Sequence, residues 1–427
     1  MLNKKVYILD YEMTSPIAVG VDTLSDSIRA NYCADKQIER ISTDGCVFRN
    51  AAEVTENLTP YYQNESTGLK KACSGDRKLE LMAACYGNSA DRLEHLIGLM
   101  SPEKTGVIVG VGADVTPFEI FEDELRDYIN QEYNPMIELY SHINDNGMNL
   151  NVVSNPYDTY ALYLANKFNA GAFQKTVLTA CVSSTQAIAL GYDAIAKGDA
   201  EVVIVGGTDS LINLLAIISF GKLGVIPESS DANSCKPFDI NRVGTLAGEC
   251  AGFAILASEE FVVKNKLTPV AELLGYGNTL DAFKITAPDP KGDSMTKAIK
   301  DAMESANLTT DMIDYINAHG TGTKHNDQLE LSCYERALGE GVKQIPISST
   351  KDRHGHAIAA AGIQELCVVL ESMKHDLVPG NMSLKTSCEP SFNLVTENTN
   401  KKIKYALSSN FAFGGINTVL AIKNVRE

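Results

Sequence analysis

Short apolar runs alternate along this chain with longer segments whose apolar residues recur every three or four positions. The short runs are rich in β-branched residues and end in glycine or polar turns, which is typical of buried strands. The longer segments have the period of an amphipathic helix. Because this alternation continues throughout, we predict layers of helix and sheet. The predicted strands are 5–9, 106–111, 176–180, 202–206, 251–257, 313–317, 345–349, 405–409 and 417–423, and the predicted helices are 76–97, 157–168, 183–197, 294–306, 326–338 and 357–373.

One local pattern occurs twice. Residues 176–205 read as strand, turn, Ala-rich helix, glycine turn and strand, and residues 345–378 repeat that order. This repetition predicts a duplicated unit, with a first half at 1–262 and a second half at 263–427.

Residues 113–150 are less regular. They are acidic and aromatic, with an Asn-Asp-Asn-Gly turn at 144–147, and they predict a helical excursion over one face of the first half. Its role stays open between covering a loop, stabilising a dimer and selecting a substrate.

Composition narrows the class of protein. The 427 residues are 44% hydrophobic, and the net charge of −17 argues against non-specific binding of nucleic acid. No apolar run approaches the ~18 residues of a membrane span. The ten cysteines include no Cys-x-x-Cys pair, so the sequence predicts neither a disulfide framework nor a zinc module. The N-terminus lacks a long apolar targeting region, and we expect a cytoplasmic protein.

Cys181 stands in Val-Leu-Thr-Ala-Cys-Val-Ser-Ser-Thr (177–185), directly before the predicted helix 183–197. Free backbone N–H groups and the helix dipole at that position favour a thiolate, which is a strong nucleophile. A cysteine by itself is more often a small buried apolar residue.

Three later segments place polar residues in glycine-rich turns after apolar strands. They are Tyr-Ile-Asn-Ala-His-Gly-Thr-Gly-Thr (315–323), Ser-Ser-Thr-Lys-Asp-Arg-His-Gly-His (348–356) and Ser-Ser-Asn-Phe-Ala-Phe-Gly-Gly-Ile-Asn (408–417). A lone histidine after a strand is usually structural. Two of them, His319 and His356, together with a cysteine at a helix start, indicate catalysis.

Taken in order, these motifs resemble the β-ketoacyl-[acyl-carrier-protein] synthases, decarboxylating condensing enzymes of the thiolase superfamily, and the synthase I/II branch in particular. The resemblance runs from about residue 70 to the C-terminus and includes Lys-Pro-Phe-Asp-Ile-Asn-Arg-Val-Gly at 236–244. It implies an acyltransferase with an α/β, thiolase-like, five-layered α-β-α-β-α fold made of two duplicated halves. It also implies a homodimer, with the strand 176–180 pairing across a two-fold axis. A heterodimer with a ketosynthase-like paralogue stays open.

The resemblance implies a role for each motif residue. Cys181 would accept the acyl group, while His319 and His356 would bind the malonyl thioester carbonyl and promote loss of CO₂. Lys351, paired with Glu330, would hold the histidine geometry. These residue types suit the reaction, since uncharged imidazole N–H groups stabilise the enolate oxygen that forms on decarboxylation.

Further roles concern the substrate. The backbone N–H groups of Cys181 and Phe413 would form the oxyanion hole, and Phe413 also matches the family's gating aromatic residue. Thr321 and Thr323 would bind the phosphopantetheine arm, which arrives on acyl carrier protein, so no metal or bound cofactor is expected. The acidic carrier protein would meet a basic patch. The predicted patch consists of Lys70, Lys71, Arg77 and Lys78, with Lys222 near the tunnel mouth.

The chain departs from the family at four places. The segment 113–150 is longer than usual. Gly171-Ala172-Phe173 replaces a Gly-Pro, Arg242-Val243-Gly244 replaces an Arg-Asp-Gly, and Phe220–Gly224 stands where an Ala-Leu-Ser is usual. None of them touches the cysteine or the histidines. The acyl length and the pathway, primary fatty acid or secondary metabolite, therefore stay open.

Other functions fit less well. A noncatalytic subunit of the chain-length-factor kind stays open, although such subunits usually lack the cysteine. A degradative thiolase would need a second cysteine in the region 411–415, which has none. Gly106–Asp114 is a poor dinucleotide motif, and residues 179–183 lack the glycines of a hydrolase turn. A zinc site would combine His319, His325, His354 and His356, but the 354/356 spacing is unusual for zinc.

Overall fold

The computed structural model describes residues 4–43, 46–113, 156–228 and 234–426. Its main strands form one mixed sheet in the order β6-β5-β7-β8-β1-β9-β15-β14-β10-β11. The first half contributes β1 (Val6–Ser15), β5 (Thr105–Val111), β6 (Phe173–Val177), β7 (Val202–Ser210) and β8 (Ala247–Ser258). The second half contributes β9 (Ala271–Leu280), β10 (Tyr315–Asn317), β11 (Ile347–Ser348), β14 (Tyr405–Phe411) and β15 (Ile416–Asn424).

The strand order repeats in the two halves. From the outer edge inward, the first half reads β6-β5-β7-β8-β1 and the second reads β11-β10-β14-β15-β9. In each half the three outer strands are parallel, and the next strand is antiparallel to both of its neighbours. Strands β1 and β9 join the halves along a short stretch of antiparallel pairing. The predicted duplication is confirmed, while the boundary at 262/263, which falls inside α9 (Glu259–Lys264), remains a prediction.

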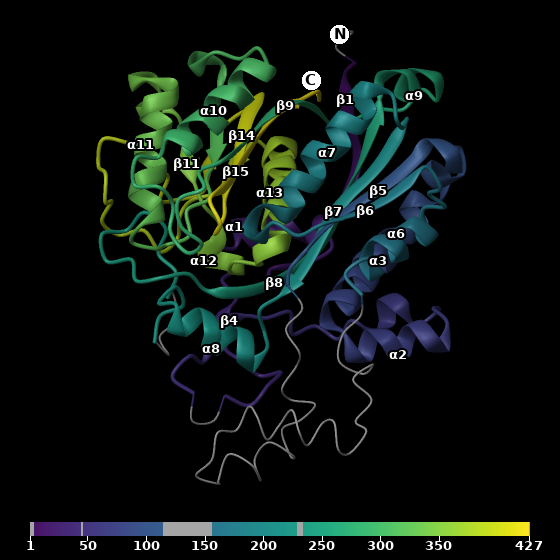
Figure 1. Cartoon of the computed structure of the whole chain (residues 1–427), viewed down its shortest axis with the longest axis horizontal. Helices are drawn as coiled ribbons and strands as arrows, with labels where there is room; N and C mark the ends of the chain where they lie inside the picture. Colours follow the sequence, from purple (N-terminus) through teal and green to yellow (C-terminus); the bar gives the residue numbers. More distant parts are fainter. Residues whose placement is uncertain (1–3, 44–45, 114–155, 229–233, 427) are drawn as a thin grey trace.

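The two halves of the sheet are the two β layers of the predicted α-β-α-β-α order, and helices form the other three layers, as Figure 1 shows. The central helices α7 and α13 pack on each other and on strands of both halves. The outer face of the first half is covered by α3 and α6, and that of the second half by α10 and α11. These helices are α3 (Arg77–Leu99), α6 (Thr159–Lys167), α7 (Ser183–Lys197), α10 (Asp293–Ser305), α11 (Asn326–Leu338) and α13 (Ala361–His375).

Smaller elements connect these layers. They are α1 (Leu24–Arg29), α2 (Thr67–Gly75), α8 (Leu214–Lys222), α12 (Lys351–His354), β2 (Ala18–Val19), β3 (Asp35–Gln37), β4 (Asn50–Ala52), β12 (Leu377–Val378) and β13 (Thr399–Asn400). No helix among the described residues is both long and apolar enough to cross a membrane.

Helix α7 shows how the sequence builds this arrangement. Most of its Ala and Ile side chains are buried between the two halves, and Gly198, in the left-handed conformation, ends it. At its start, α7 lies directly on β5. A Cβ on Gly110 of β5 would stand 2.3 Å from the backbone nitrogen of Ser184. The missing side chain at Gly110 therefore lets the first turn of α7 approach the sheet.

Some predicted elements were wrong. The strand predicted at 176–180 ends at Val177, and β6 starts earlier, at Phe173. Strand β9 was missed because Gly275 and Gly277 interrupt its apolar alternation, and a Cβ at Gly277 would overlap the backbone of α10. Helices α2 and α8 were also missed. The predicted excursion at 113–150 lies, beyond its first residue, outside the described residues and remains a prediction.

Candidate active site

Cys181 lies in a tight 3-10 turn, Ala180–Val182, between β6 and α7. Ala180 has a φ of 51°, a left-handed conformation that an alanine rarely adopts. The Ser183 hydroxyl holds the turn, since it accepts from the Thr179 N–H and donates to the Ala180 carbonyl, each at 2.8 Å. The predicted turn and helix around the cysteine are confirmed, and the strand before them is β6, which ends at Val177 rather than at residue 180.

The predicted thiolate is wrong for the resting site. Burial raises the pKa of the Cys181 thiol to about 12, although the charge of Lys351 and the backbone N–H of Phe413 lower it. The dipole and N–H groups of a helix start contribute only about 0.3–1 kcal/mol, which is less than the cost of burying an anion. Cys181 is therefore a thiol at neutral pH. The Phe413 N–H bonds to the sulfur, next to which the predicted oxyanion would form.

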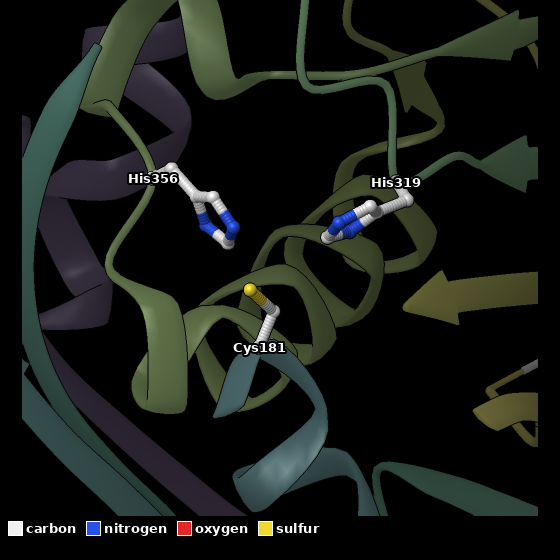
Figure 2. Close-up of side chains that lie close together, drawn as sticks. All are labelled: Cys181, His319 and His356. Carbon is white, nitrogen blue, oxygen red and sulfur yellow. The ribbon is translucent and has the colours of Figure 1, made fainter. Parts of the chain in front are cut away.

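Both histidines meet the cysteine. His319 follows β10, and His356 is held by its N–H, which donates to the Leu246 carbonyl at 2.8 Å. The imidazole rings lie edge to face with centroids 5.3 Å apart. The sulfur and a ring nitrogen of each histidine all lie within 4.8 Å of one another (Figure 2).

Both imidazoles are buried and uncharged. Burial, followed by the charge of Lys351, lowers the pKa of His319 and of His356 well below the ordinary value. The Nδ1 atom of His319 lies 3.4 Å from two donors, the Lys351 ammonium and the Asn410 side-chain amide. Nδ1 therefore accepts, and the ring proton resides on Nε2. Neither ring nitrogen of His356 has a hydrogen-bond partner in the described part of the chain.

Lys351 is paired with Glu365, so the predicted pairing of Lys351 with Glu330 is wrong. The fully buried ammonium contacts a Glu365 carboxylate oxygen and donates to the His319 carbonyl at 2.6 Å. The second Glu365 oxygen accepts from Asn410 at 2.7 Å. Glu365 lies on the central helix α13, which faces the lysine.

Glu330 lies on the outer helix α11 and holds the backbone of the histidine turn instead. Its oxygens accept from the N–H groups of His319 and Gly320 at 2.7 and 2.8 Å, and from Asn326 and Tyr334. Burial raises the pKa of Glu330 to about 7, although the hydrogen bonds from the His319 and Gly320 N–H groups lower it. Lys351, Glu365 and Glu330 thus act as positioning residues.

A pocket of about 440 Å³ opens onto the cysteine and the histidines. Thr321 and Thr323 line it, with their hydroxyls 2.9 Å apart. Phe413 lines it too, in the turn between β14 and β15. The structure therefore brings the predicted substrate residues to the same pocket as the reactive groups.

The predicted carrier-protein patch is partly wrong. Arg77 is paired with Glu249 and Glu80 and also donates to a backbone carbonyl, because buried Glu249 needs a counter-charge. Lys78 is buried, with its ammonium 5.5 Å from the centre of the Tyr160 ring. Of the remaining members, Lys70 is half-buried on α2, and Lys71 on α2 and Lys222 at the end of α8 are exposed. Lys222 precedes Leu223, which lines the pocket.

The four-histidine zinc site does not form. His325 is exposed, and both ring nitrogens of His354 are bonded, to Thr350 and to the Gly355 carbonyl. Cys181, His319 and His356 lie close enough to surround a metal ion. The two donors at Nδ1 of His319 nevertheless leave the proton on Nε2, and the Lys351 charge repels a cation.

Comparisons with known proteins match both halves. The family model described as "Beta-ketoacyl synthase, N-terminal domain" matches residues 86–261, and the model described as "Beta-ketoacyl synthase, C-terminal domain" matches residues 270–385. The chain is 28% identical to 3-oxoacyl-[acyl-carrier-protein] synthase 2 of Staphylococcus aureus over 99% of this chain and 98% of that protein. It is 36% identical to nodulation protein E of Rhizobium meliloti over 58% of this chain and 61% of that protein.

A solved structure agrees with these relatives. The β-ketoacyl synthase from Burkholderia phymatum STM815 superposes with a TM-score of 0.82 at 25% identity, covering 99% of this chain and 100% of that one. Two consecutive domain models of one family thus match the two consecutive halves of the chain. The fold, with its duplicated layers, is the fold of a solved member of that family. The chain belongs to the β-ketoacyl synthase family of thiolase-fold condensing enzymes.

Proposed function

We propose that this protein condenses an acyl group held on Cys181 with malonyl-[acyl carrier protein], in fatty acid or polyketide biosynthesis. The observation that carries the proposal is the meeting of one thiol and two uncharged imidazoles within 4.8 Å at the end of the pocket. The reaction needs a nucleophile that accepts an acyl group and two donors that stabilise an enolate.

In the first half-reaction the sulfur of Cys181 attacks the carbonyl carbon of an acyl thioester. The oxyanion that forms is stabilised by the backbone N–H groups of Phe413 and Cys181, both of which favour negative charge at the sulfur. Each such donor lowers the activation barrier by about 2.7–4 kcal/mol. On collapse the carrier leaves as a thiol. Since Cys181 starts as a thiol, its proton must move to the leaving sulfur, and the unpartnered ring of His356 is placed to pass it on.

In the second half-reaction a malonyl thioester enters the same pocket. The Nε2–H of His319 and an N–H of His356 donate to its thioester carbonyl. CO₂ leaves, and the electron pair of the broken C–C bond forms the enolate. The enolate carbon then attacks the acyl carbon on Cys181, and the C–S bond breaks. Because both imidazoles are uncharged, they stabilise the enolate without holding the malonyl carboxylate in an ion pair.

The partner follows from the chemistry of the pocket. The Thr321 and Thr323 hydroxyls offer hydrogen bonds to an amide-containing arm, as in the phosphopantetheine of acyl carrier protein.

We further propose a homodimer, with the edge strand β6 pairing across the two-fold axis. Leu178, directly after β6, is 45% exposed in the single chain.

The test is intact-protein mass spectrometry after incubation with a panel of acyl-carrier-protein thioesters. Wild type should gain one acyl group, and Cys181→Ala should gain none. Cys388→Ala is the matched control, because this half-buried cysteine does not line the pocket. Cys181→Gln should still decarboxylate malonyl thioester, since the amide imitates the acylated cysteine. No adduct from any donor would overturn the proposal and favour a noncatalytic subunit.

A further inference from the structure

The outer part of the pocket has positive charge without a counter-charge. Lys324 and His325 are exposed and line the pocket. Neither side chain has a hydrogen bond or an ion pair within the described residues. No described aspartate or glutamate lines the pocket, although the chain has 54 acidic residues and a net charge of −17. An unpaired cation in a pocket without acids favours a ligand with an anionic outer end.

The backbone that presents these two side chains is held in place. Arg242, which is 7% exposed, donates to the carbonyl of Thr323 at 2.9 Å and to that of Lys324 at 3.1 Å. Its third bond, to the Asp239 carbonyl at 3.0 Å, connects it to the neighbouring turn. Because the backbone of the turn is fixed before a ligand arrives, little backbone entropy is lost when Lys324 and His325 bind one.

The chemical type of the side chains changes from the inner end of the pocket to its opening. Along the chain, His319 is 2% exposed, Thr321 is 7% exposed, Thr323 is half-buried, and Lys324 and His325 are exposed. The segment 319–325 therefore runs from the reacting groups to the opening. From the inside outward it offers an uncharged imidazole, two hydroxyls and two basic side chains. A matching ligand has a thioester at its inner end, hydrogen-bonding amides along its length and an anion at its outer end.

We propose that Lys324 and His325 bind the phosphate of the phosphopantetheine arm, so that the pocket selects phosphorylated pantetheine thioesters over unphosphorylated ones. This inference rests on the proposed function, since it names a contact of the same substrate. An exposed charge pair contributes about 0.2–1 kcal/mol, and 1.4 kcal/mol is tenfold in affinity. Two such contacts give a preference of about two- to thirtyfold.

The experiment compares acyl-phosphopantetheine with acyl-pantetheine as donors, with the acyl group that reacts fastest from the carrier protein. The rate of Cys181 acylation is followed by intact-protein mass spectrometry. Wild type should favour the phosphorylated donor by about two- to thirtyfold. Lys324→Ala/His325→Ala should lose this preference, and Lys324→Arg should keep it. Lys402→Ala is the matched control, since exposed Lys402 precedes β14, whose other end, at Phe411, reaches the pocket.

Two results would overturn the inference: equal use of both donors by wild type, or a preference that survives in the double variant. If wild type uses both donors equally but the double variant slows transfer from intact carrier protein, the two side chains bind carboxylates of the carrier instead. Failure of all donors to acylate Cys181 would overturn the proposed function alone. Calorimetry of phosphopantetheine and pantetheine on Cys181→Ala then decides the phosphate contact without the reaction, and equal affinities would refute it.

Discussion

The Lys351–Glu365 ion pair should stabilise the fold only as a pair. Both side chains are buried, at 0% and 1% exposure, so neither charge is solvated if its partner is removed. Lys351→Met leaves a buried carboxylate that, within the described part of the chain, is bonded only to Asn410, and Glu365→Leu leaves a buried ammonium bonded to the His319 backbone carbonyl. Each single change should lower the free energy of unfolding by about 3–5 kcal/mol. The double variant Lys351→Met/Glu365→Leu should lose much less, because replacing both partners with apolar residues is often near neutral.

Chemical denaturation at one fixed protein concentration measures the coupling between the two sites. The surface pair Lys297–Asp301, with side chains 65% and 32% exposed, is the control, and its coupling should stay below about 1 kcal/mol. If the losses at Lys351 and Glu365 simply add, the buried charges are not interdependent and the reasoning fails.

The double variant also tests the electrostatic role of Lys351. Its charge lowers the pKa of both His319 and His356, so its removal should raise both values towards the ordinary one. The proposed decarboxylation needs uncharged imidazoles, and activity is therefore lost as the pH falls through these pKa values. Raised pKa values move the acidic limb of the pH–rate profile to higher pH. Malonyl decarboxylation measured against pH reports this shift, and an unmoved limb would refute the role.

Three further predictions concern single groups. Glu330→Gln should lower the free energy of unfolding by about 1–3 kcal/mol in denaturant titrations, because its amide NH₂ would face N–H donors; an unchanged midpoint would contradict this. The rate at which iodoacetamide alkylates Cys181 should keep rising with pH beyond pH 9, as expected for a pKa of about 12. A rate that reaches a plateau below pH 8 would rule out the buried thiol. Gly110→Ala should lower the free energy of unfolding by about 1–3 kcal/mol in thermal melts and slow Cys181 acylation, because its Cβ would displace Ser184. Gly98→Ala is the control: its Cβ would meet open space, and the same melts should show α3 stabilised by about 0.4–1 kcal/mol.

The reactive residues could be predicted because they follow strands. Cys181 follows β6, His319 follows β10, His356 comes after β11, and Phe413 follows β14. Parallel strands of an α/β sheet place their carboxyl ends at one edge, where sites of such folds form. A polar residue in a glycine turn after an apolar run is therefore a strong local signal. The helix boundaries 183–197 and 326–338 were also predicted correctly, because both helices have a clear period and a glycine directly after their last turn.

The supporting residues depend on tertiary contacts that spacing does not reveal. Glu330 and Glu365 both lie on helices near the histidine turns, and only the placement of α13 in the central layer puts Glu365 beside Lys351. A signal for Glu365 existed, since it is an acidic residue inside the apolar helix predicted at 357–373. Arg77 and Lys78 resemble surface charges at a helix start, and only the buried carboxylate of Glu249 shows why Arg77 points inward.

Burial and one positive charge together set the protonation states of the site. Lys351 lowers the pKa of the Cys181 thiol and lowers the pKa of both histidines. The lower thiol pKa favours a cysteine-to-histidine proton transfer, whereas the lower imidazole pKa opposes the imidazolium that this transfer would leave in the pocket. Burial then decides between the states that remain, and it favours the uncharged thiol with two uncharged imidazoles. The histidines therefore keep their N–H groups as donors for the enolate oxygen. An uncharged lysine would leave burial as the main cause that keeps the histidines uncharged, which gives a physical reason for burying a complete Lys351–Glu365 ion pair behind His319 rather than a neutral hydrogen bond.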